Sequence, residues 1–212
     1  MKVSYSLVSL IWLLGVSSMI NAAVLPDRTR LVLNETDKSV SVRLTNKSET
    51  LPYLAQSWIE DSEGKKTRNF ISPLPPLLRL DPREQSQVRL MALPPLATLP
   101  KDRESLFYYN VREVPPRMED KNAMQIAMQS RLKLFWRPKA IVLKAGAVMT
   151  WDKVDISQTA NGINFKNNTP YYVTVGYIGL DGKTLIAGGN SIMVAPFDQE
   201  TMTVKNLPSS FK

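Results

Sequence analysis

The residues from 122 to 138 alternate between hydrophobic and polar positions and then become basic and aromatic. In the first half, Met124, Ile126 and Met128 fall on one face of an extended strand, and polar or small residues fall on the other. The whole stretch contains no acidic residue. Natural sheets usually protect an exposed edge with charge, proline or bulges. The pattern therefore leaves two alternatives: a central strand paired on both sides, or an edge strand that receives another chain by β-augmentation.

Short runs with a period of two residues recur before this stretch and predict further β-strands. Polar or proline-containing turns separate them, and helical periodicity is nearly absent after residue 22. Seven such strands in about 115 residues are typical of an immunoglobulin-like sandwich, and we expect Trp58, on the third strand, in its core. The predicted strands are Arg28–Leu33, Val40–Leu44, Tyr53–Ile59, Phe70–Leu80, Gln87–Met91, Leu106–Val111 and Met124–Trp136. Because Phe70–Leu80 contains three prolines, we expect it to be an edge strand or a crossing segment.

A second set of strand-like runs begins after residue 141. It fills residues 142–212, fewer than the roughly 100 residues of a seven-stranded sandwich. We therefore predict an all-β protein with two immunoglobulin-like β-sandwich domains, residues 23–141 and 142–212, of which the second lacks one or two strands. The runs are Val148–Trp151, Val154–Ser157, Gly162–Lys166, Tyr171–Ile178, Ser191–Val194 and Thr201–Val204.

Residues 1–22 have the composition of a secretory signal peptide. Lys2 gives a basic start, an apolar run extends from Leu7 to Val16, and small or polar residues precede Ala22. We predict cleavage after Ala22, because the apolar run is too short to act as a membrane-spanning anchor. Of 212 residues, cleavage would leave 190, and the loss of Lys2 would lower the formal net charge from +8 to +7. This balance suggests an acidic or anionic partner, or serves only solubility, and scattered basic residues in an exported chain argue against nucleic acid.

The chain contains no cysteine and no histidine. An exported domain without cysteine has to be stabilised by its core alone. Ser-His-Asp and Cys-His catalysis are excluded, and so are the usual zinc sites. No carboxylate pair stands in a setting that indicates acid–base chemistry. We therefore expect no enzymatic activity, no metal and no cofactor.

Four motifs, taken in order, resemble those of the periplasmic pilus-assembly chaperones of Gram-negative bacteria, the PapD-like family. The resemblance implies two immunoglobulin-like domains set as a boomerang around a cleft. It also implies a function, since members lend a strand of the first domain to a fimbrial subunit that lacks one and release the subunit to an outer-membrane usher. The motifs are DRTRLVL at Asp27–Leu33, LPYLAQSWIED at Leu51–Asp61, LPKDRESLFYYNVREVPP at Leu99–Pro116 and RLKLFWRP at Arg131–Pro138.

The resemblance also assigns roles to single residues. Arg30 and Lys133 match two cleft cations that bind the terminal carboxylate of the subunit, a role that suits arginine and lysine; without the resemblance both would be interpreted as solvated surface charges. Met124, Ile126 and Met128 match the donor-strand residues that fill the subunit groove, although alternation alone would favour the chain's own core. Strict alternation places Lys133 and Met128 on opposite faces, so we expect a twist or bulge between them.

Glu104 and Arg137 match two members of an interdomain ionic network in the family. The third member is an acidic residue in an Asn-Asp motif followed by glycine, and no such motif precedes Lys212. The connection from Pro116 to Asn122 is short, as in the subfamily with a short loop before the donor strand.

The chaperone interpretation predicts fimbrial subunits and an outer-membrane usher as partners, a periplasmic location, and self-association of the free protein through its exposed apolar row. Other interpretations remain open. The chain could be a truncated, poorly active remnant of such a chaperone. It could also be a secreted fimbrial structural subunit, although its predicted mature start runs straight into a strand. An enzyme on a β-sandwich is disfavoured by the missing histidine and cysteine.

Overall fold

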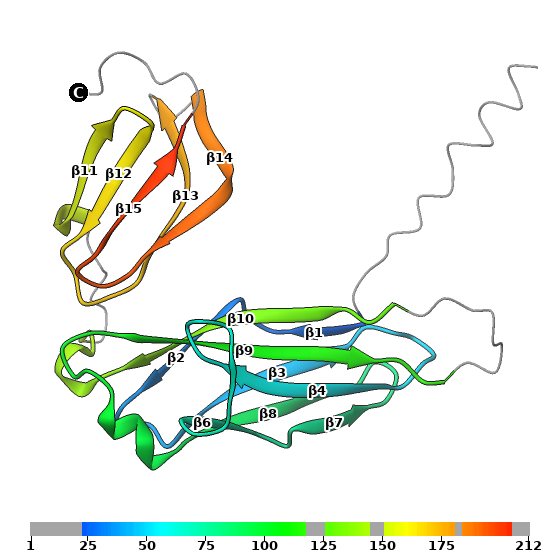
Figure 1. Ribbon diagram of the computed structural model, residues 1–212. Coiled ribbons are helices and arrows are strands. Elements are labelled where there is room, and N and C mark those ends of the chain that lie inside the picture. The colour runs from blue at the N-terminus through cyan, green and yellow to red at the C-terminus, as the bar shows by residue number, and fades with distance from the viewer. Residues whose placement is uncertain (1–22, 118–125, 145–150, 181–183, 205–212) are drawn as a thin grey trace, which may run out of the picture.

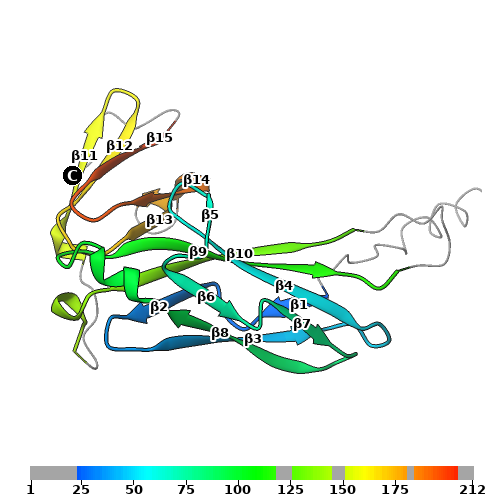
Figure 2. The ribbon, with the colours of Figure 1, turned by 60° about the horizontal axis from the view of Figure 1, so that its bottom comes forward.

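The computed structural model describes residues 23–117, 126–144, 151–180 and 184–204. The described chain is almost entirely β-structure and forms two immunoglobulin-like domains, which confirms the predicted fold class. The second domain stands at one end of the first, at an angle to it (Figure 1). A view turned by 60° places the second domain at the same end (Figure 2).

The first domain is a sandwich of two sheets. One sheet has the strand order β1-β3-β8-β6, and the other has the order β2-β10-β9-β4-β5, with β7 also pairing with β4. β2 and β10 pair in parallel, whereas the other pairs are antiparallel. The strands are β1 (Val24–Pro26), β2 (Arg30–Asn34), β3 (Ser39–Asn46), β4 (Tyr53–Glu60), β5 (Lys66–Thr67), β6 (Ile71–Leu74), β7 (Leu77–Leu80), β8 (Gln85–Ala92), β9 (Ser105–Val114) and β10 (Gln129–Arg137), and the 3-10 helix η1 (Pro94–Thr98) follows β8.

Tyr109 and Trp136 are the largest side chains buried between these sheets. Tyr109 comes from β9 and Trp136 from β10, the two neighbouring strands of the larger sheet. The Tyr109 hydroxyl lies 2.8 Å from Ser57 Oγ, so the buried phenol has a hydrogen-bond partner. Burial raises the pKa of Tyr109 to about 12, because the charged phenolate is disfavoured away from water.

The prediction that Trp58 fills the core is wrong. Ser57 and Ile59 are the buried neighbours on β4, so alternation turns Trp58 to the other face, where it is partly exposed. There its indole N–H donates to Glu60 Oε1 at 2.8 Å, and Lys66 Nζ lies 4.5 Å from its ring centre. Trp58 therefore belongs to a polar surface cluster.

The described part of the second domain contains a three-stranded sheet, β11-β12-β15, and a two-stranded sheet, β13-β14. A separate hydrophobic core, which includes Phe165 and Val173, lies between them. The predicted run at 148–151 lies mostly outside the described residues, and its last residue begins the 3-10 helix η3 (Trp151–Lys153). The strands are β11 (Val154–Thr159), β12 (Gly162–Asn167), β13 (Val173–Leu180), β14 (Thr184–Val194) and β15 (Gln199–Thr203).

Three features of the first domain differ from the predicted strands. The predicted strand Phe70–Leu80 is divided into β6 and β7 at Pro75, where a proline interrupts pairing. β1 and β5 were not predicted, because runs of two or three residues show no period. β10 begins at Gln129, whereas Met124, where we expected the last strand to start, lies outside the described residues.

Candidate functional site

Two cationic side chains meet across the parallel strands β2 and β10. Arg30, the first residue of β2, is in register with Lys133 of β10, and Arg30 is exposed whereas Lys133 is partly buried. Burial, and secondarily the positive charge of Arg30, lower the pKa of Lys133. Neither cation forms an ion pair with a carboxylate of the described residues. The pair is therefore a positively charged position that can accept an anion.

Lys133 lies on the face of β10 that is turned to the second domain. Its Nζ donates a long hydrogen bond of 3.4 Å to Thr174 Oγ1 of β13. Two residues further along β10, the ring centre of Phe135 lies 5.5 Å from that of Tyr172. The other face of β10 packs into the core of the first domain through Leu132, Leu134 and Trp136.

We expected a twist or a bulge between Met128 and Lys133, and β10 as described contains no bulge. The pairing of β10 with β9 runs from Gln129 to Trp136 without a register shift. No shift is needed, because the second domain lies over the outward face of β10 and Lys133 points there directly. By alternation, Met128 and Ile126 continue the opposite row, beyond the chain's own core, and their side chains are 41% and 54% exposed.

The two halves of β10 have different neighbours. From Lys133 to Arg137 the strand pairs with β2 on one side and with β9 on the other. From Gln129 to Leu132 its only partner in the described chain is β9. In the described chain, β10 is thus paired on both sides in one half and lies at the sheet edge in the other. The open edge, residues 129–132 of β10, ends where Arg30 and Lys133 face each other.

An ion pair within the first domain, between Arg137 and the buried Glu104, contacts the second domain. Arg137 donates to Glu104 Oε1 from Nε at 2.9 Å and from Nη2 at 2.7 Å, and the Glu104 side chain is only 3% exposed. Glu104 Oε2 accepts the backbone N–H of Tyr172 at 2.9 Å, and the Glu104 N–H donates to the Pro170 carbonyl at 2.9 Å. Arg137 also lies 5.1 Å from the ring centre of Tyr171. The pair therefore holds the segment 170–172 of the second domain.

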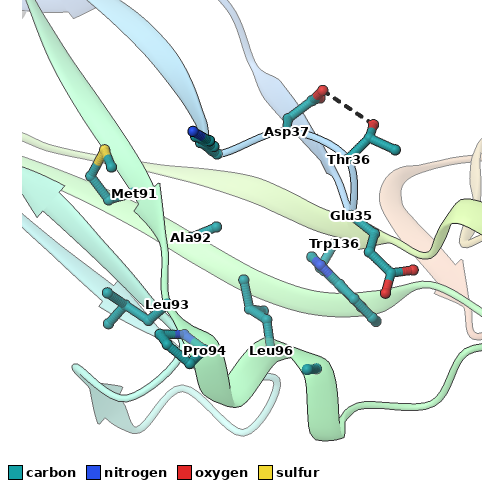
Figure 3. Close-up of a pocket in the computed structure, with 11 residues that line it drawn as sticks. Glu35, Thr36, Asp37, Met91, Ala92, Leu93, Pro94, Leu96 and Trp136 are labelled. Carbon is teal, nitrogen blue, oxygen red and sulfur yellow. Dashed lines mark hydrogen bonds between the residues drawn. The ribbon is translucent and has the colours of Figure 1, made fainter.

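A hollow of about 460 Å³ lies between the turn after β2 and the helix η1 (Figure 3). Glu35 and Trp136 are part of its wall. Lys101 contacts both, since its Nζ lies 2.7 Å from Glu35 Oε1 and 4.7 Å from the Trp136 ring centre. None of the predicted site residues lines this hollow. Its lining consists of Glu35, Thr36, Asp37, Lys38, Met91, Ala92, Leu93, Pro94, Leu96, Ala97 and Trp136.

Sequence reasoning missed Glu113, a buried acid of β9. Phe107, Tyr109 and Val111 occupy the core-facing positions of that strand, and Glu113 continues the same alternation with only 5% exposure. An acidic residue at an inward position is the signal that could have identified it, because a buried charge requires partners. Phe135 and Tyr172 were also missed, since a contact between domains leaves no local pattern.

The described residues contain no group of three or more histidine, cysteine, aspartate or glutamate side chains that could hold a metal ion. Nor does any described helix have the length and apolar character needed to cross a membrane. What the described site offers to a partner is a strand edge and two cations.

Two family models match the chain. The model described as "Pili and flagellar-assembly chaperone, PapD N-terminal domain" matches residues 23–142, and "Pili assembly chaperone PapD, C-terminal domain" matches residues 149–212. The chain belongs to the PapD-like family of pilus-assembly chaperones. The family resemblance seen in the sequence motifs is thereby confirmed.

Individual PapD-like proteins agree with this assignment. The chain is 52% identical over 197 residues to "Uncharacterized fimbrial chaperone YqiH" of Escherichia coli K12, covering 92% of this chain and 79% of that protein. It is 42% identical over 197 residues to "Chaperone protein PapD" of Escherichia coli, covering 91% and 81%. The crystal structure of the E. coli chaperone DraB matches with a TM-score of 0.70 at 27% identity, covering 89% and 86%. A role as a fimbrial chaperone follows from this membership.

Proposed function

We propose that the chain is a periplasmic chaperone that binds and caps fimbrial subunits by donor-strand complementation and delivers them to an outer-membrane usher. The observation that carries the proposal is the open edge of β10, which ends at the Arg30–Lys133 pair. The exposed side chains of Ile126 and Met128 precede this edge. An apolar row, a free strand edge and a cationic end together suit a partner strand that brings main-chain pairing and a terminal carboxylate.

The position of Arg30 and Lys133 at one end of the open edge determines in which direction a partner strand would run. β2 begins at Arg30 and runs parallel to β10, in line with the open edge. A partner strand on the open edge brings its carboxyl terminus to Arg30 and Lys133 only when it also runs parallel to β10. Its α-carboxylate can then form two parallel hydrogen bonds with the arginine guanidinium and an ionic contact with the lysine.

The apolar row supplies the second part of the interaction. Ile126 and Met128 continue the core-side face of β10 past the end of the first domain. The third residue of the predicted donor row, Met124, lies outside the described residues. Ile126 and Met128 are therefore available to complete the core of a subunit that lacks a strand. Methionine is unbranched and polarizable and adapts to different partner surfaces. This function requires no catalytic residue and no cofactor.

Co-expression in a periplasm with candidate fimbrial subunits, followed by tag-based capture, tests the proposal. We expect a one-to-one complex that is weakened by about 2 kcal/mol or more, roughly 30-fold, by either Arg30→Ala or Lys133→Ala, because each change leaves the subunit carboxylate with one cation. Arg83→Ala is the control, since Arg83 is an exposed arginine that pairs with Glu49. Unchanged capture by both site variants would show that the carboxylate anchor is wrong.

The same experiment separates the chaperone from the alternatives. A fimbrial structural subunit would polymerise when purified rather than form a one-to-one complex. A poorly active remnant would remain soluble, or be degraded, and would capture no subunit even with Arg30 and Lys133 intact. A complex that depends on both cations supports the chaperone.

A further inference from the structure

A buried carboxylate lies at the end of the first domain that is remote from the second domain. Glu113 stands on β9, follows Tyr109 and Val111 in the core-facing alternation, and is 5% exposed. Among the described residues, no lysine or arginine side chain forms an ion pair with it. A carboxylate at such a position is costly unless hydrogen bonds and a positive charge compensate for its lost hydration.

Three backbone N–H groups converge on this carboxylate. The nitrogens of Ala23 and Val24 lie 2.7 and 2.9 Å from Glu113 Oε2, and the nitrogen of Met128 lies 3.3 Å from Oε1. The Ala23 carbonyl in turn accepts the N–H of Lys47 at 2.6 Å. Because Val24 begins β1 in the four-stranded sheet and Glu113 belongs to the other sheet, the carboxylate links the two layers of the sandwich.

We propose that Glu113 is the binding site for the α-ammonium group of the mature chain, which signal-peptide cleavage between Ala22 and Ala23 creates. In the precursor the Ala23 nitrogen is a neutral amide. Hydrolysis of the Ala22–Ala23 peptide bond by a signal peptidase consumes one water, leaves a carboxylate on Ala22 and leaves a protonated amine on Ala23. The nitrogen that lies 2.7 Å from Oε2 then carries a full positive charge, and a hydrogen bond from a neutral amide to the carboxylate becomes an ion pair between two charged groups.

This ion pair links cleavage of the signal peptide to Met128, the last residue of the predicted donor row. Glu113 Oε1 accepts the N–H of Met128, and the Glu113 N–H donates to the Met128 carbonyl at 3.0 Å. Met128 immediately precedes β10 and its open edge. The charged N-terminus of the mature chain therefore fixes the carboxylate that holds Met128, and ties β1 to the start of the donor segment. The inference goes beyond the proposed function and rests on the predicted cleavage site.

A two-by-two comparison tests the ion pair. One pair of chains begins at Ala23 and the other carries Gly-Ser before Ala23, each with and without Glu113→Gln, which keeps a carbonyl acceptor but removes the charge. We expect the extension to lower the melting temperature of the wild-type chain by about 5 °C and to have little effect in the Glu113→Gln background. The pKa of the Ala23 α-amino group, followed by pH-dependent acylation, should lie above that of the unpaired α-amino group of the extended chain.

Several results would overturn the proposal. The N-terminal sequence of the exported protein could begin at a residue other than Ala23, or the extension could destabilise both backgrounds equally. If Glu113→Gln does not fold, the α-amino pKa of the wild-type mature chain decides, since a value equal to that of the extended chain contradicts an ion pair. Subunit capture, measured in parallel with Arg30→Ala, reports on the proposed function separately, because the α-amino pKa does not depend on any subunit.

Discussion

Arg30 and Lys133 carry the same charge but differ in their surroundings. Arg30 is exposed, whereas Lys133 is partly buried, and burial together with the nearby Arg30 charge lowers the Lys133 pKa below its ordinary 10.5. Between the lowered pKa and 10.5, the unfolded chain binds more protons than the folded chain, so the contribution of Lys133 to stability increases with pH in that window. The site thus holds a protonated lysine at a cost in stability, and under the proposed function a bound carboxylate would reduce that cost.

Titration of Lys133 by NMR checks this account. We expect Arg30→Gln to raise the Lys133 pKa, because one of the two causes of its depression is removed, and a bound terminal carboxylate to raise it further. Carboxylate binding should therefore take up protons, and the affinity should decrease as the pH rises through the Lys133 pKa of the complex. A Lys133 that titrates at its ordinary value, or that does not respond to Arg30→Gln, would contradict the coupling of the two cations.

The sequence suggested candidate site residues but not their environments. Arg30 and Lys133 could be named from family motifs, and the register of β2 with β10 brings them together. Trp58 shows the limit of alternation, because the period of a strand says which residues share a face but not which face is buried. On β4 the small Ser57 is inside, since it lies against the hydroxyl of Tyr109, and the large Trp58 is outside.

At the scale of elements, the sequence could predict that the first domain ends with a strand. It could not predict that this strand has one half paired on both sides and one half paired on one side in the described chain. The alternating and basic halves of the stretch 122–138 were evident, yet the change at Lys133 depends on β2, which begins about 100 residues earlier in the chain. Strand pairing over such separations leaves no local pattern. β1 was not predicted for a related reason. Val24–Pro26 is too short to show a period, and its first residue is held by a hydrogen bond to Glu113, which is distant in sequence.

The donor row gives a prediction at this scale. Met128→Asp and Ile126→Asp each place a charge where the row would enter an apolar groove, so we expect subunit capture to weaken by about 2 kcal/mol or more. Both side chains are exposed in the free chain, and the melting temperature should therefore change little. Ala127→Asp is the matched control, because Ala127 is exposed and alternates to the other face. Equal losses for Ala127→Asp and Met128→Asp would contradict a one-sided donor row.

At the scale of the whole molecule, the family motifs predicted two domains and placed Glu104 and Arg137 in a network between them, but they did not predict which groups of the second domain this pair contacts. The contacts combine a side chain of one domain with the backbone of the other, as Glu104 Oε2 does with the Tyr172 N–H. A second contact places the Arg103 guanidinium 5.1 Å from the ring centre of Phe197. The motif Leu99–Pro116 contains Arg103 and Glu104, but their partners Phe197 and Tyr172 belong to the second domain and lie outside the four motifs. These contacts place Thr174 beside Lys133, at the position where the proposed function would bring a subunit terminus.

Variants of the Glu104–Arg137 pair test whether this ion pair maintains the arrangement of the two domains. Removing either partner leaves a buried charge uncompensated, so Glu104→Gln and Arg137→Met should each destabilise the protein by about 3 kcal/mol, whereas the double variant should lose less than the sum. Small-angle scattering should show a wider distribution of distances between the domains. Arg79→Met, which removes an exposed arginine paired with Asp81, should change stability by no more than about 0.5 kcal/mol. If scattering is unchanged in all three pair variants, the domain angle is fixed by the apolar contact of Phe135 with Tyr172 rather than by the ion pair.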